Sequence, residues 1–214
     1  MTRLLALVLV FAAPALAMYS KPPIEELVLT ADAIVEGVIV NTIVGPDGGH
    51  FLLEVRRVIA GPITSREIEV EKFINWPCAQ RWAPYARGQH LLLFLSKGSS
   101  GVWKILSAGG EGEMPITDGR AFTQYSELAL TETGKHSVNG ATMWAREVPV
   151  AELIAALRMA RSCFTAKVAD DGRRIDAVRL QCGTDAKTTA DRSPLTAKLF
   201  SALARIKRET GKPF

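Results

Sequence analysis

The chain has few of the residues from which metal and redox sites are built. It contains three histidines and three cysteines among 214 residues. No Cys-x-x-Cys occurs, so neither a thioredoxin-type redox motif nor a zinc knuckle is indicated. The histidines, His50, His90 and His136, are far apart, and none has a neighbour at metal-ligand spacing. We therefore predict no metal site and no cofactor.

Motifs for covalent catalysis and for phosphate binding are also missing. Residues 98–101 (Gly-Ser-Ser-Gly) lack the Gly-x-Ser-x-Gly pattern of a nucleophile elbow and lie in a predicted hairpin turn. Residues 109–112 (Gly-Gly-Glu-Gly) have no Lys-Ser or Lys-Thr after them, and their glutamate would repel phosphate. We assign no catalytic residue and favour a non-enzymatic protein. The alternative is a hydrolase with a convergent site around His90 or His50.

A strong excess of one charge is absent as well. The formal net charge is +4, which gives little electrostatic attraction to nucleic acid, and nucleic acid is an unlikely partner. Apolar residues make up 48% of the chain, enough for a core and too many for a disordered protein. The last stretch is basic, with a single acid, Glu209, among Lys198, Arg205, Lys207, Arg208 and Lys212. This stretch would suit either contact with an anionic membrane surface or packing on the domain.

No apolar run reaches the length of about 20 residues that spans a bilayer. The first seventeen residues instead combine Arg3, an apolar run over residues 4–13 and Ala-Leu-Ala at 15–17. These are the three parts of a secretory signal peptide. We expect cleavage after Ala17 and a periplasmic or secreted mature protein. An uncleaved N-terminal anchor and a buried core helix are the alternatives.

The cysteine count bears on this compartment, because disulfides persist in exported proteins. Cys78, Cys163 and Cys182 form an odd set, so one thiol is free or bridges to another chain. Residues 164–168 and 175–180 have the pattern of two strands around an Asp-Asp-Gly turn at 170–172. Such a hairpin would place Cys163 opposite Cys182, and we predict a bridge that contributes about 3 kcal/mol. Two reduced, buried thiols are the alternative, and the role of Cys78 stays open.

The remaining pattern predicts a mainly β fold with flanking helices, an α+β protein. A helix is expected over residues 24–30, and strands over 33–40, 50–59, 67–71, 91–95 and 102–106, with a hairpin around Asp118-Gly119. Gly37 predicts a bulge or bend in its strand. A helical period begins after residue 148, and Ser193-Pro194 begins a final helix. We divide the chain into a signal peptide (1–17), a β domain (18–147), a helix with a disulfide-linked hairpin (148–183), and a polar linker with a basic helix (184–214).

One block of the chain carries a family resemblance. It comprises residues 31–37 (Ala-Asp-Ala-Ile-Val-Glu-Gly), residues 54–62 (Glu-Val-Arg-Arg-Val-Ile-Ala-Gly-Pro), Cys78, and residues 85–95, which end in Leu-Leu-Leu-Phe-Leu. This block resembles the netrin-like module of tissue inhibitors of metalloproteinases and its exported bacterial relatives. The resemblance implies an OB-like five-stranded barrel. Those inhibitors bind the zinc of their target through an N-terminal Cys. The expected mature N-terminus here is Met18, so the resemblance implies the fold and not the inhibitory mechanism.

Aromatic and basic residues alternate in one segment, which makes it the candidate binding site. Trp76, Arg81, Trp82, Tyr85 and Arg87 fall within twelve residues. Such a loop beside an OB barrel could stack on a sugar, a base or a peptide. Alternatively, the tryptophans plug the barrel end and the arginines are solvated. We expect an exported binding module for a protein or small ligand in the envelope or outside the cell. An envelope-associated structural protein held by its C-terminal helix is a further alternative.

Overall fold

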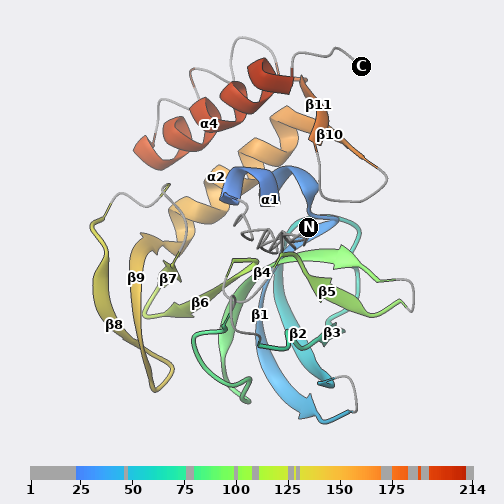
Figure 1. Ribbon diagram of the computed structural model, residues 1–214, viewed down its shortest axis with the longest axis vertical. Coiled ribbons are helices and arrows are strands. Elements are labelled where there is room, and N and C mark those ends of the chain that lie inside the picture. Colours follow the sequence, from blue (N-terminus) through green and yellow to red (C-terminus); the bar gives the residue numbers. More distant parts are fainter. Residues whose placement is uncertain are drawn as a thin grey trace, which may run out of the picture.

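The computed structural model describes residues 23–45, 48–75, 80–98, 101–107, 111–124, 128, 131–169, 175–182, 188 and 193–210. Figure 1 shows a barrel, a curled sheet beside it and a layer of helices that covers both. The elements in chain order are α1 (Ile24–Thr30), β1 (Ala33–Ile43), β2 (His50–Ala60), β3 (Glu67–Glu71), β4 (His90–Lys97), β5 (Trp103–Ile105), β6 (Glu113–Thr117), β7 (Arg120–Thr123), β8 (Gly134–Val138), β9 (Ala141–Pro149), α2 (Val150–Cys163), β10 (Phe164–Val168), β11 (Ile175–Leu180) and α4 (Pro194–Thr210).

The first five strands form a closed barrel, as predicted. They pair in the order β1-β2-β3-β5-β4, and β4 returns to pair with β1. The β3–β5 pair is parallel, and the other pairs in the barrel are antiparallel. Alternate residues of each strand point inward because successive side chains of a strand lie on opposite faces. The interior side chains are Ala33, Val35, Ile39, Phe51, Leu53, Ile68, Val70, Leu91, Leu93 and Leu95.

The predicted bend at Gly37 is present as an irregularity in β1. The register between β1 and β2 shifts between Glu36 and Gly37. A Cβ atom at position 37 would lie 2.5 Å from the carbonyl oxygen of Glu54. Only glycine permits this close approach, and the resulting bend lets β1 pair with β2 and β4 in one closed barrel.

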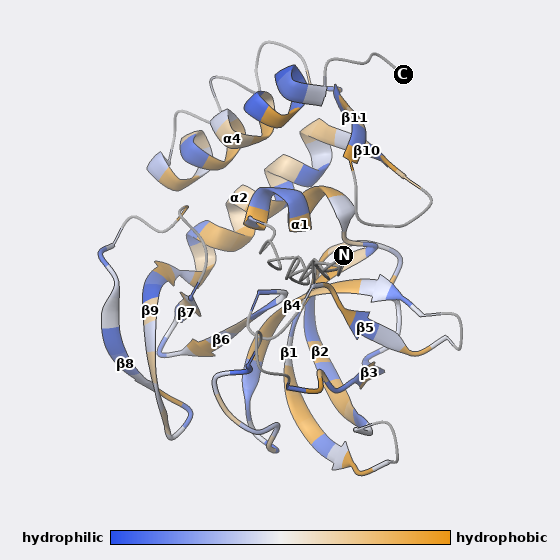
Figure 2. Cartoon of the chain, viewed as in Figure 1, coloured by the Kyte–Doolittle hydropathy of each residue, from blue (hydrophilic) through white to orange (hydrophobic). Residues whose placement is uncertain are grey.

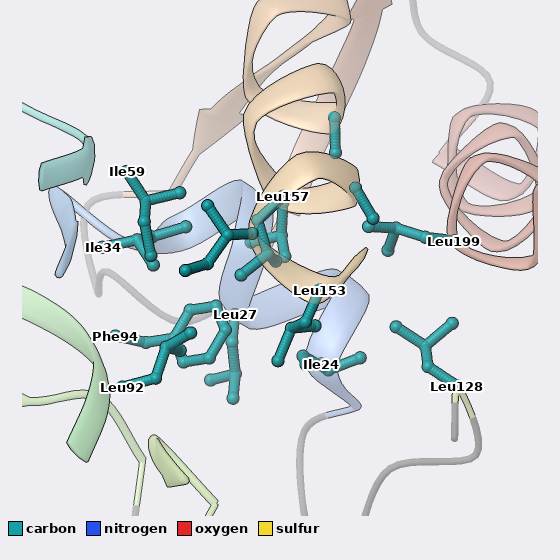
Figure 3. Packing of buried hydrophobic residues seen from close by; sticks show 14 of the residues in the cluster. Ile24, Leu27, Ile34, Ile59, Leu92, Phe94, Leu128, Leu153, Leu157 and Leu199 are labelled. Atoms are coloured by element: carbon teal, nitrogen blue, oxygen red, sulfur yellow. The ribbon is translucent and has the colours of Figure 1, made fainter. Parts of the chain in front are cut away.

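The outer face of the barrel is apolar where the helices cover it. Ile34, Leu92 and Phe94 pack there against α1 and α2, next to Leu27 and Leu157 (Figure 3). This second buried face explains the five consecutive apolar residues of β4, which are fully buried on both sides of the sheet. The same cluster continues to Leu199 and Leu203 of α4, so the outer face of the barrel and the helices share one core, separate from the barrel interior.

Beside the barrel, β6, β7, β9 and β8 extend the sheet from β4. The β6–β7 turn is the predicted hairpin, and Asp118 (φ 49°) and Gly119 (φ 72°) have the left-handed backbone of a two-residue turn. The β8–β9 hairpin was not expected from the sequence. Its turn residues, Asn139 (φ 49°) and Gly140 (φ 80°), have the same geometry. The Asn-Gly pair was the signal that could have identified it.

The C-terminal elements form the helical layer and a small hairpin. Cys163, at the end of α2, is bonded to Cys182 after β11, which confirms the predicted disulfide. The Asp-Asp-Gly turn between β10 and β11 lies outside the described residues. Helix α4 begins at Pro194 as predicted and buries Leu195, Leu199 and Leu203. Figure 2 shows this apolar side of α4 facing α2. Among the described helices, none is both long enough and apolar enough to cross a membrane.

Candidate functional site

The five residues of the predicted binding loop have different surroundings. Trp76 lies outside the described residues, as does Cys78. Arg87 is exposed, and Trp82 and Tyr85 are partly buried. The side chain of Arg81 is only 2% exposed. A solvated role for both arginines, which the sequence left open, therefore does not hold for Arg81.

The guanidinium of Arg81 is held by the loop that carries it. Its central carbon lies 3.7 Å from the ring centroid of Tyr85 and 4.5 Å from that of Trp82. Nη2 donates to Oε1 of Gln89 over 2.9 Å, and Nη1 donates to the carbonyl oxygen of Ala83. Because these contacts use both ends of the guanidinium, the side chain fixes the shape of residues 81–89.

A buried carboxylate completes this cluster. Glu113, on β6, has a side chain with no exposed surface, and its Oε1 lies 2.6 Å from Nε of Arg81. The indole nitrogen of Trp82 donates to the same oxygen over 2.7 Å. Burial raises the pKa of Glu113, while the charge of Arg81 and the hydrogen-bond donors around the carboxylate act in the opposite direction. The cluster therefore joins the loop to the sheet that extends the barrel.

Tyr85 and Trp82 connect the cluster to two regions of the core. The Tyr85 ring stacks on Phe51 with 5.0 Å between centroids, and its hydroxyl accepts a hydrogen bond from the Phe73 backbone. Burial raises the pKa of Tyr85, and the carboxylate of Glu113 adds to the effect. Trp82 packs against the barrel interior and against a second cluster formed by Phe122, Val138, Met143 and Ala145. Packing thus accounts for Arg81, Trp82 and Tyr85, and a ligand-binding role for the loop stays a prediction.

The same end of the barrel carries exposed apolar side chains that sequence reasoning missed. Ile43 is 42% exposed, Val44 90% and Ile74 59%. Nζ of Lys72 donates to the carbonyl oxygen of Ile43 over 2.9 Å, and a Cβ atom at Gly48 would meet Cγ1 of Ile74 at 2.7 Å. These contacts place the backbone of Ile43 beside Lys72 and the side chain of Ile74 beside Gly48, so the three exposed residues lie near the same end of the β1–β2 hairpin. We call Ile43, Val44 and Ile74 the barrel-end patch.

The histidines lie on separate strands. Nε2 of His90 is 3.0 Å from Oε1 of Glu36, and Nε of Arg57 is 3.4 Å from the other oxygen of that carboxylate. His50 begins β2, and the ring of His136 on β8 lies against Phe122. Within the described ranges, no group of three or more histidine, cysteine, aspartate or glutamate side chains is arranged to hold a metal ion. A hydrolase site at His90 would use Glu36 as the carboxylate beside the histidine, and a site at His50 stays a prediction.

Neither the protein-family models nor the curated proteins compared with the chain match it. No ligand or reaction is therefore carried over from a relative, and the function is inferred from the contacts described above.

Proposed function

We propose that the protein is an exported, non-enzymatic binding module that holds a protein partner at the barrel-end patch. The observation that carries this proposal is the exposure of Ile43, Val44 and Ile74 at one end of the barrel. Single exposed apolar residues are common on soluble proteins, but a group of them at one place marks an interaction site. Exposed apolar side chains gain free energy when a partner removes them from water.

The shape of the patch favours a protein over a small ligand. Small-molecule sites are concave and enclose most of the ligand. Val44, by contrast, is 90% exposed and follows the last residue of β1, at the hairpin end that projects from the barrel (Figure 1). A protruding apolar side chain fits a pocket on a partner protein, in the way of an interface anchor. Lys72 and His50 beside it supply the polar rim that such interfaces have.

Two features support export. Residues 1–17 have the pattern of a signal peptide. The Cys163–Cys182 disulfide is of the kind that oxidising compartments preserve. The OB-like barrel is also compatible with the netrin-like resemblance of residues 31–95.

One observation favours the second candidate, an exported hydrolase. A histidine within 3.0 Å of a carboxylate, as His90 is of Glu36, is the arrangement that orients a general base. Arg57 lies beside the other oxygen of Glu36. The contact between His90 and Glu36 is therefore explained equally well by a surface ion-pair cluster that has no catalytic role. Loss of hydrolysis in His90→Ala would establish the enzyme, provided that a substrate is found first.

The proposal is tested by crosslinking from the patch in the native host. A photoreactive amino acid at position 44 of the full chain should crosslink to one defined protein. Replacing Ile43 and Ile74 together by Ser should lower the affinity of the purified pair by about tenfold or more, since two apolar contacts are lost.

The matched control is Leu180→Ser. Leu180 is 39% exposed on β11, away from the barrel strands, so this variant should bind like the wild type. Equal affinity of the Ile43/Ile74 variant and the wild type would overturn the proposal, as would a photoreactive residue at 180 that captures the same protein equally well.

A further inference from the structure

The β8–β9 hairpin carries the most exposed aromatic side chain among the described residues. Trp144 on β9 is 64% exposed. In the antiparallel register it lies directly opposite Lys135 of β8, so the two side chains are neighbours on one face. Thr142 and Arg146 are two residues away on either side of Trp144 and therefore share that face. We call these four residues and Ser137, which pairs with Thr142, the indole face.

The apolar residues on the opposite face of the hairpin are buried in the core. Met143 and Ala145 are buried there, with Val138 across the pair, against Phe122 and Trp82. Trp144 therefore cannot turn inward without displacing this packing. Its exposure follows from the strand register, and among the described residues Trp144 belongs to none of the buried hydrophobic clusters.

The indole face is positively charged. It contains Lys135 and Arg146 and no acidic side chain. Within the described residues Lys135 forms no ion pair, and Nε of Arg146 donates to a neutral partner, Oγ1 of Thr133, over 3.2 Å. The nearest acid along β9 is Glu147, which points to the other face and lies 3.8 Å from Arg120. The face thus offers an aromatic ring, two cations and the hydroxyls of Thr142 and Ser137.

We propose that the indole face binds an acidic saccharide. The face of an indole ring carries negative electrostatic potential, which attracts the weakly positive C–H groups on one side of a pyranose ring. Lys135 and Arg146 lie where they can pair with a carboxylate of the sugar, and the hydroxyls of Thr142 and Ser137 can hydrogen-bond to its hydroxyls. The site is separate from the barrel-end patch and does not depend on it.

Other partner classes fit this face less well. A stable protein interface buries about 800 Å² on each partner around several apolar anchors, whereas Trp144 is the one large apolar side chain that is exposed on the described part of this hairpin. Proteins that bind single-stranded nucleic acid stack successive bases on successive aromatic rings. A single ring between two cations matches a single charged sugar ring.

The test is a titration of the full mature chain with trigalacturonate, followed by backbone NMR shifts and by calorimetry. We expect shifts that cluster at residues 134–146, about tenfold weaker binding of the uncharged maltotriose, and affinity that falls as salt is added. Trp144→Ala should abolish the binding, and Lys135→Ala should weaken it about tenfold. Both residues are exposed, so their variants should unfold at the denaturant concentration of the wild type.

Val44→Ser provides the matched control, because it alters the barrel-end patch and should leave saccharide binding unchanged. The proposal is overturned if the wild-type chain gives no shifts at 10 mM trigalacturonate, taken as roughly the weakest affinity a specific site would show. It is equally overturned if Trp144→Ala binds as the wild type does, or if a single-stranded DNA oligonucleotide binds the face more tightly than the saccharide does.

Discussion

Nε of Arg81 lies 2.6 Å from Oε1 of Glu113, and the two side chains are 2% and 0% exposed. One partner comes from an irregular loop and the other from β6. A charge that is removed from water is stable only when it is paired and hydrogen-bonded. The loop therefore belongs to the core, although its sequence has the composition of a binding surface.

Arg81→Ala should lower the free energy of unfolding by about 3–5 kcal/mol, because it leaves the Glu113 carboxylate buried without its counter-charge. Urea denaturation followed by circular dichroism measures this loss. The matched control is Arg87→Ala, which removes an exposed arginine from the same loop and should change stability by less than about 0.5 kcal/mol.

A double variant separates the ion pair from simple loss of volume. Replacing Arg81 by Met and Glu113 by Leu removes both charges and keeps apolar bulk, so it should be more stable than Arg81→Ala. If Arg81→Ala unfolds at the same urea concentration as the wild type, the buried pair contributes nothing to the fold.

Tyr85 should make the protein sensitive to alkaline pH. Burial keeps the pKa of Tyr85 above the value of about 10 that an unfolded tyrosine has. Above that pH the unfolded state binds fewer protons than the folded state. The free energy of unfolding therefore falls as the pH rises, by up to about 1.4 kcal/mol per pH unit from this group.

Tyr85→Phe tests this assignment. At pH 7 the variant should be about 1 kcal/mol less stable than the wild type, because the hydrogen bond from the Phe73 backbone is lost. Above about pH 10 its stability should decline less steeply, since the buried hydroxyl is gone. The test range of pH 9 to 11 spans roughly one unit on either side of the pKa of an unfolded tyrosine. If the free energy of unfolding falls equally steeply with pH in both proteins over this range, the role of Tyr85 is refuted.

The disulfide should stabilise the fold by about 3 kcal/mol, since it joins cysteines 19 residues apart. Replacing Cys163 and Cys182 together by Ser should lower the urea midpoint and make it independent of reductant. Cys78→Ser serves as the control and should keep the response of the wild type to reductant. If the urea midpoint of the wild type does not change when reductant is added, the disulfide does not contribute to the stability of the fold.

The parts of the fold that were predicted correctly have determinants close together in sequence. Asp118-Gly119 specifies its own turn, and the β10–β11 hairpin aligns Cys163 with Cys182. The β8–β9 hairpin escaped prediction despite Asn139-Gly140. On β8 the inward positions include Gly134 and His136, so the apolar alternation that marks a strand is missing.

The environment of the candidate loop could not be predicted in the same way. Arginine is seldom buried unless it is paired, and the partner of Arg81 is Glu113, which belongs to a distant strand. The local sequence does not predict that Glu113 is buried and paired with Arg81, because Glu111 lies two residues away and the segment has the composition of an acidic surface loop. The exposure of Val44 and Trp144 likewise depends on which faces the sheet covers, a property of the tertiary structure.

The core between the outer face of the barrel and the helices is completed only by residues late in the chain. Ile34, Leu92 and Phe94 are translated early, but the residues that cover them include Leu157, and the same cluster is completed only by Leu199 and Leu203. A chain that ends before α2 therefore leaves this apolar sheet face uncovered, and a chain that ends before α4 leaves the apolar side of α2 uncovered. A chain truncated before α2 should therefore aggregate more readily than the complete chain, because its barrel keeps an exposed apolar face.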